Sequence, residues 1–167
     1  MNDLKRLFSN KEILCDLIKD HLEEFKEMTH DEIMNCFLGE VQADKKDLYL
    51  PFYEGDEDLK YGIYFKLISP KLDYHHEIIC ALEFREKEDE LKPLEMPPCA
   101  GLSLLLMLQA KEENENKNIA ERCYGIYFYL DSPEELKGTA NRYNVHIKTN
   151  EKSLLKDNCC TGIELFL

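Results

Sequence analysis

Apolar residues near the start of the chain recur at intervals of three and four positions, the spacing of the buried face of an amphipathic helix. The series is Ile13, Leu14, Leu17, Ile18, Leu22 and Phe25. A capping-box pattern over residues 9–12 precedes it, so the pattern predicts a helix over residues 10–27. A second capping box over residues 29–32 predicts a short helix that ends at Gly39.

The middle and the end of the chain carry short apolar runs separated by proline, glycine and charged residues, a pattern typical of strands. The predicted elements are strands over residues 61–68, 76–84, 123–130, 144–148 and 162–167, a short helix over 118–121, and an irregular or edge segment over 48–53. The run from His76 to Phe84 is almost continuously apolar, so we expect it at the centre of a sheet. Pro97 and Pro98 open a leucine-rich helix over residues 99–111, which we expect to be a buried crossover.

These elements predict a single domain over residues 1–167 in the α/β or α+β class, with helices flanking a central mixed sheet. A length of 167 residues suits one domain, and 44% hydrophobic residues are enough for a sizeable core. Residues 1–8 lack the apolar core of a signal peptide, and the run Leu102–Leu108 is too short to cross a membrane. We therefore expect a cytoplasmic protein without membrane association.

The charge balance is strongly acidic, with 34 Asp and Glu residues, 21 Lys and Arg residues and a formal net charge of -13. Proteins hold phosphate backbones with Lys and Arg, and the pairs Lys5-Arg6 and Lys45-Lys46 are too small to reverse this field. The charge therefore disfavours direct binding to DNA. Two explanations remain open, namely solubility and an acidic face that competes for a basic groove on a partner.

The seven cysteines are scattered, and no pair has the CxxC spacing of a zinc or redox site. Several lie in apolar stretches, where a reduced cysteine behaves as a small hydrophobic residue. Cys159 and Cys160 are too close in sequence for an ordinary disulfide or a convincing chelate. This usage favours a reducing compartment, and we expect no metal bound by cysteine or histidine.

Short motifs spread over most of residues 4–148 stand in a recognisable order. They are Leu4-Lys5 with Phe8, Asn10-Lys11-Glu12, Tyr61–Phe65, Ile78–Arg85, Cys123–Leu130, the Ser132-Pro133 turn, and Lys137–Tyr143, which is close to an N-T-x-x-R-Y pattern. Together they resemble the PD-(D/E)XK nuclease family of transposase-like, recombination-promoting proteins of bacteria. The resemblance implies a mixed sheet flanked by helices and a bacterial or phage-infected bacterial cell.

The resemblance also implies a metal site, because an Asp and a Glu on neighbouring strands of that family hold a divalent ion, usually Mg²⁺. A Lys or Gln two residues beyond the Glu positions the water or the metal. On this chain the Glu corresponds to Glu83, and the Lys or Gln position is occupied by Arg85, which cannot bind a metal or act as a base. The Asp position is Gly62, and Asp58 replaces it only if the strand bends over roughly 13 Å or the alignment slips.

The degenerate metal site and the negative charge favour binding over catalysis. We expect a catalytically degenerate nuclease-like protein that needs no cofactor and binds a basic nucleic-acid-binding protein or complex. Such a protein inhibits a nucleic-acid-handling complex in the manner of an anti-CRISPR or other anti-defence inhibitor of a mobile element. One alternative is an active Mg²⁺-dependent DNA endonuclease with Glu83 and Asp58 as metal ligands. Another is self-association, in which the apolar strand over residues 163–167 pairs edge to edge with a second copy.

Overall fold

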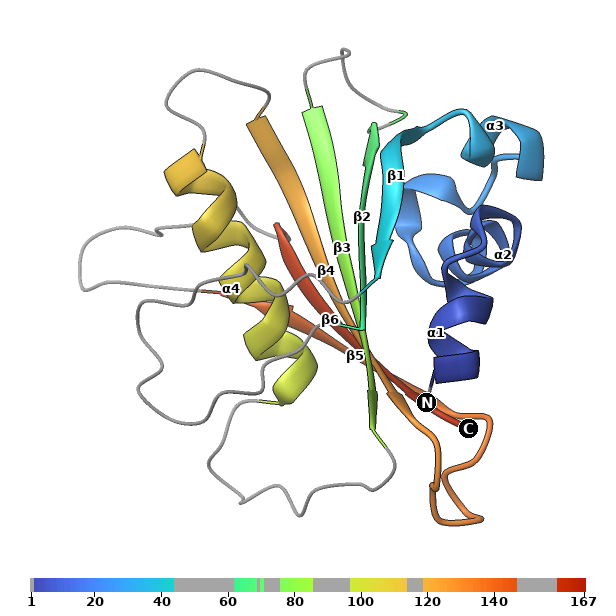
Figure 1. Cartoon of the computed structure of the whole chain (residues 1–167). Helices are drawn as coiled ribbons and strands as arrows, with labels where there is room; N and C mark the ends of the chain where they lie inside the picture. Colours follow the sequence, from blue (N-terminus) through green and yellow to red (C-terminus); the bar gives the residue numbers. More distant parts are fainter. Residues whose placement is uncertain are drawn as a thin grey trace, which may run out of the picture.

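The computed structural model describes residues 2–43, 62–68, 70, 76–85, 97–113, 119–146 and 159–167. In these residues a six-stranded mixed sheet lies between two layers of helices, so the predicted α/β class is confirmed (Figure 1). One face is covered by α1 (Asn2–Phe8), α2 (Lys11–His21), the 3-10 helix η1 (Glu23–Phe25) and α3 (His30–Met34), and the other by α4 (Pro98–Glu113). None of the described helices is long and apolar enough to cross a membrane.

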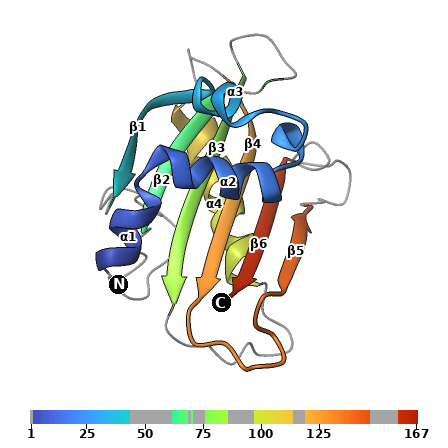
Figure 2. The same ribbon diagram turned by 90° about the vertical axis from the view of Figure 1, so that its right-hand side faces the viewer.

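The sheet has the strand order β1-β2-β3-β4-β6-β5, which Figure 2 shows from the side of α1–α3. The strands are β1 (Phe37–Ala43), β2 (Ile63–Ile68), β3 (His76–Arg85), β4 (Ile119–Tyr129), β5 (Ala140–Val145) and β6 (Cys160–Phe166). The first three strands pair antiparallel, α4 is the crossover between the parallel strands β3 and β4, and β6 runs parallel to β4 and antiparallel to β5. The predictions of a central β3 and of a crossover helix are confirmed.

Side chains of β3 alternate between two apolar cores, one on each face of the sheet. The residues facing α1–α3 are Ile78, Cys80, Leu82 and Phe84, which pack with the apolar side of α2. Ile79 and Ala81 face α4, whose buried residues include Leu102 and Leu106. By the same alternation, Glu83 lies on the α4 face.

Helix α4 rests on two glycines that are direct neighbours on β4 and β6, Gly125 and Gly162. A Cβ on Gly125 would lie 2.4 Å from the carbonyl oxygen of Cys99, and a Cβ on Gly162 would lie 2.5 Å from the nitrogen of Ala100. Both contacts are with the backbone of the first turn of α4. The paired glycines therefore allow the helix to approach the sheet more closely than any other residue would permit.

The predicted helix over residues 10–27 is shorter in the structure, because Leu22 has an extended backbone and ends the helical hydrogen bonding. The Asn10 side chain caps α2, while the capping box of Thr29 and Glu32 at α3 forms as predicted. The second helix ends at Met34, so the prediction of Gly39 as its stop was wrong. Gly39 instead has a φ of 72° within β1, where the register with β2 shifts.

Three further predictions need correction, and a fourth falls on residues that the structure does not describe. Residues 119–121, predicted as part of a helix over 118–121, form the start of β4. The strand predicted over residues 144–148 overlaps β5, which begins earlier, at Ala140, only at Asn144 and Val145. Strand β6 pairs with both β4 and β5, so residues 163–167 do not form a sheet edge and the basis for edge-to-edge self-association is removed. Residues 48–53 lie outside the described part of the chain.

Candidate functional site

The carboxylate singled out from the sequence, Glu83, lies near the end of β3 and is half-buried. Gly62 immediately precedes β2, whose first residue, Ile63, is opposite Leu82 of β3. A Cβ on Gly62 would lie 2.9 Å from the side chain of Phe84. A side chain at Gly62 would therefore point toward Phe84 on the α1–α3 face, whereas Glu83 lies on the α4 face, so the two positions do not face one another.

Of the other two residues of the predicted metal site, the structure describes the strand position of Arg85 but does not describe Asp58. Arg85 is the last residue of β3 and pairs with Tyr129 of β4, two positions after Glu83 as predicted. Asp58 lies outside the described residues. Among the residues that are described, no group of three or more His, Cys, Asp or Glu side chains could hold a metal ion.

A row of polar side chains crosses the sheet at the level of Glu83. The register places Glu83 beside Tyr127, Tyr127 beside Glu164, and Glu164 beside Asn141. The two glutamates are therefore separated by two strand spacings, about 10 Å between their Cα atoms. Tyr127 stands between them, so the row does not form the close carboxylate pair that holds one metal ion.

Glu164 is the most deeply buried carboxylate of the row, with 2% of the residue exposed. Its oxygens accept hydrogen bonds from the Tyr143 hydroxyl at 2.9 Å, from the Tyr129 hydroxyl at 3.3 Å and from Asn141 Nδ2 at 3.4 Å. Burial, and then the bond to Glu164, raise the pKa of Tyr143 to about 12. These bonds link β4, β5 and β6 and provide the partners that a buried carboxylate requires.

The sequence prediction missed Glu164. The signal was available, since Glu164 is the one charged residue in an otherwise apolar final strand. What the sequence did not indicate is that two residues of the N-T-x-x-R-Y-like motif, Asn141 and Tyr143, are its partners. In this structure those motif residues stabilise the sheet.

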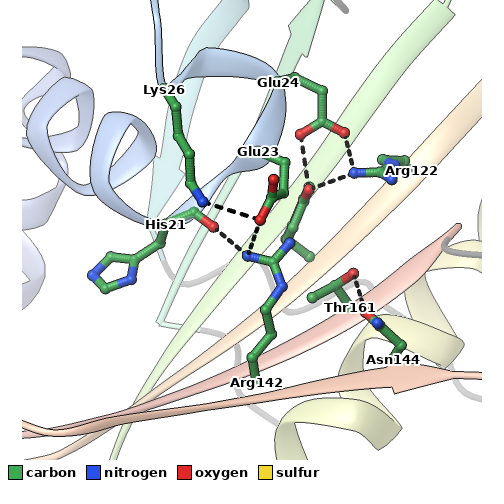
Figure 3. Close-up of polar contacts among 9 residues, drawn as sticks. His21, Glu23, Glu24, Lys26, Arg122, Arg142, Asn144 and Thr161 are labelled. Atoms are coloured by element: carbon green, nitrogen blue, oxygen red, sulfur yellow. Dashed lines mark hydrogen bonds and ion pairs between the residues drawn. The ribbon is translucent and has the colours of Figure 1, made fainter.

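The opposite face carries a polar network centred on Glu24 of η1 (Figure 3). The Tyr124 hydroxyl donates a hydrogen bond to Glu24 Oε2 at 2.8 Å, and Arg122 Nη1 forms an ion pair with Glu24 Oε1. Arg122 also donates to the Tyr124 oxygen at 3.0 Å. Burial, and then the neighbouring carboxylate, hold the pKa of Tyr124 well above its usual range. The network attaches η1 to β4 across roughly a hundred residues of sequence.

Arg142 of β5 extends this connection toward the end of α2 (Figure 3). Its Nη1 donates to the carbonyl oxygen of His21 at 2.9 Å and lies 3.7 Å from Glu23 Oε1. Its guanidinium also stands over the ring of Tyr124, 5.9 Å from the centroid. The Arg of the motif thus binds a helix end of its own chain, which is a structural role.

The outer side of α2 carries a regular row of carboxylates. Glu12, Asp16 and Asp20 are exposed and follow one another at intervals of four residues, so they lie on one side of the helix about 6 Å apart. We call these three residues the acidic stripe. Other exposed carboxylates of the same helical layer are Asp3, Glu23, Glu27, Asp31 and Glu32.

Comparisons with protein-family models, with curated proteins and with solved structures each found no match to this chain.

Proposed function

We propose that this chain is a catalytically degenerate PD-(D/E)XK-nuclease-like protein that acts by binding a basic, nucleic-acid-handling protein or complex. The binding inhibits the partner by occupying a groove that otherwise holds a nucleic-acid backbone, as an anti-CRISPR or other anti-defence inhibitor would. The proposed contact surface is the helical layer that contains the acidic stripe.

The observation that carries the proposal is the packing of Gly62 against Phe84. Gly62 supplies no ligand, and a Cβ there would be 2.9 Å from the Phe84 ring, on the face of the sheet opposite to Glu83. In the relatives that the chain resembles, this position supplies a carboxylate to the metal. Arg85 at the Lys or Gln position is a second departure, because a guanidinium is a fixed cation.

The acidic stripe supports the choice of a basic partner. Three exposed carboxylates at intervals of about 6 Å form a row of negative charge, and a helix presents them on a rigid support. The net charge of -13 repels a polyanion and attracts a basic groove. Complementary charge of this kind increases the association rate and makes the complex sensitive to salt.

The proposal is tested by inhibition assays against purified RNA-guided nuclease complexes and other basic DNA-processing enzymes at low ionic strength. We expect the protein to bind and inhibit at least one of them, with an affinity that falls as salt rises. Each exposed ion pair contributes roughly 0.2–1 kcal/mol. Reversing Glu12, Asp16 and Asp20 to Lys together should therefore weaken binding by about tenfold or more.

The matched control reverses three exposed carboxylates of the β4–β5 connection, Asp131, Glu134 and Glu135. It changes the net charge by the same amount but leaves the acidic stripe intact. We expect this control to retain most of the affinity. Equal loss in both triple variants would reject the acidic stripe as the contact surface, and failure of the unmodified protein to bind any basic enzyme would reject the proposed function.

The alternative of an active endonuclease retains one specific observation in its favour, the presence of Glu83 near the end of a central strand. It predicts that the protein cleaves plasmid DNA with Mg²⁺ or Mn²⁺ and that Glu83→Ala abolishes the cleavage. Intact plasmid in the presence of either metal would reject this alternative.

A further inference from the structure

Three cysteines that the proposed function does not use meet on the α4 face, where the amino end of β6 lies beside β4. They are Cys123 of β4, Cys160 of β6 and Cys159 immediately before β6, and all three are reduced and lie in the same buried cluster. The Sγ atoms of Cys159 and Cys160 are 3.9 Å apart, and the Cys123 nitrogen donates to the Cys159 carbonyl at 2.8 Å. The fold therefore brings Cys123 close to Cys159 and Cys160, which follow it by more than thirty residues in the sequence.

The strand register favours one pairing among the three. Cys123 and Cys160 are direct neighbours on parallel strands, and their side chains enter the same core. Neighbouring strands lie about 4.8 Å apart, which is inside the range of roughly 4.4–6.8 Å between Cα atoms of disulfides. Consecutive residues have Cα atoms only about 3.8 Å apart, so a disulfide between Cys159 and Cys160 is strained.

Access to the cluster differs between the three thiols. Cys123 and Cys160 have no exposed surface, whereas 6% of Cys159 is exposed. A small oxidant therefore reaches Cys159 first. The Cys160 sulfur lies 3.9 Å from the Cys159 sulfur.

We propose that these three cysteines form an oxidation site, at which a peroxide converts Cys123 and Cys160 into a disulfide through Cys159. The Cys159 thiolate attacks the peroxide, so that an S–O bond forms, the O–O bond breaks and one water leaves. The Cys160 sulfur then attacks the Cys159 sulfur and displaces the second oxygen, which leaves as water with the Cys160 proton. The Cys123 sulfur attacks the Cys160 sulfur in this strained disulfide, and Cys159 leaves and takes up the Cys123 proton.

The overall reaction balances, because hydrogen peroxide is reduced to two water molecules and two thiols are oxidised to one disulfide. The product links β4 to β6 two residues before the paired glycines Gly125 and Gly162 and closes the intervening chain into a loop. A disulfide that closes a loop restricts the unfolded chain, so the oxidised protein should have a higher Tm than the reduced protein. In a reducing compartment such a bond is transient, which is typical of redox-sensing cysteines.

The experiment uses the full-length reduced protein and hydrogen peroxide, followed by alkylation of the remaining thiols and peptide mapping by mass spectrometry. We expect a cross-linked peptide pair that joins Cys123 to Cys160, the loss of two hydrogen atoms from the intact mass, and reversal by dithiothreitol. Cys159→Ala should slow the cross-link at least severalfold without changing its position. The unmodified protein alone decides the pairing, so the test does not depend on whether a variant folds.

Cys15 and Cys36, which both belong to the apolar core on the α1–α3 face, serve as the comparison for the three clustered cysteines. Cys36 is half-buried and therefore more accessible than Cys159. If the only disulfide found joins Cys15 to Cys36, or if the three clustered cysteines stay reduced while Cys36 gains oxygen, the proposal is wrong. A stable Cys159–Cys160 disulfide without the Cys123–Cys160 product would also overturn it. These outcomes concern sulfur chemistry alone and leave the proposed binding function unaffected.

Discussion

The close packing of α4 on Gly125 and Gly162 leads to the most direct stability prediction. In Gly125→Ala the added methyl group would lie 2.4 Å from the Cys99 carbonyl oxygen and 2.8 Å from the Ser103 nitrogen. Ordinary van der Waals contacts are about 1 Å longer, so the first turn of α4 must move away from the sheet. The obstacle is backbone, which cannot rotate away as a flexible side chain could.

Overpacking of a core costs about 1–3 kcal/mol, and a clash with backbone belongs at the upper end of this range. The substitution also lowers the conformational entropy of the unfolded chain, which offsets roughly 0.4–1 kcal/mol of this loss in stability. We therefore expect Gly125→Ala to lower the free energy of unfolding by about 2 kcal/mol, and Tm by about 4–8 °C for a chain of this size. Thermal and urea unfolding followed by circular dichroism measure both quantities.

Gly39→Ala is the matched control, because no atom lies within 4 Å of a Cβ at Gly39 and only its φ of 72° opposes the change. This control should cost about 1 kcal/mol. Gly162→Ala displaces the same turn of α4, so the double variant with Gly125→Ala should lose less stability than the sum of the two single variants. If Gly125→Ala is no less stable than Gly39→Ala, α4 does not pack on the sheet as described.

The remaining predictions concern the two polar networks. Glu24→Ala leaves the Arg122 guanidinium and the Tyr124 hydroxyl without their shared acceptor, so we expect a loss of about 2–3 kcal/mol in urea unfolding. The exposed Glu27→Ala should stay within about 0.5 kcal/mol of the unmodified protein, and equal effects would contradict the role of this network. The raised pKa of Tyr143, about 12 against an ordinary value of 10.0, stabilises the fold below pH 10, and this contribution is lost as pH rises to about 12. Tyr143→Phe should therefore show a smaller loss of stability between pH 10 and 12 than the unmodified protein, and identical alkaline profiles would argue against its bond to Glu164.

The elements predicted from the sequence are those with a strong apolar pattern. The apolar series of α2, the continuous run of β3 and the leucines of α4 each bury a face, and burial is what an apolar pattern reports. Strands β1 and β5 were not placed correctly. Most of their residues are exposed, so their sequences carry little signal, and backbone pairing with a neighbour decides where they form.

The residues of the candidate site also differ in how far the sequence predicted them. Glu83 was placed on a central strand from the sequence, and the structure confirms that position and extends the strand to Arg85. The partners of Glu164, Glu24 and Arg142 were not predicted, because each hydrogen bond joins segments that are distant along the chain. Spacing along one helix or strand says nothing about which segment will pack against it.

The sequence by itself determined the class of fold, the central position of β3 and the acidic balance. These properties follow from composition and from local periodicity, which every residue carries with it. Only the tertiary structure decided that Phe84 closes the position of Gly62, that Gly125 and Gly162 together support α4, and that Cys123 meets Cys160. Each of these depends on strand order and register, which come from long-range pairing and from the packing of both faces of the sheet.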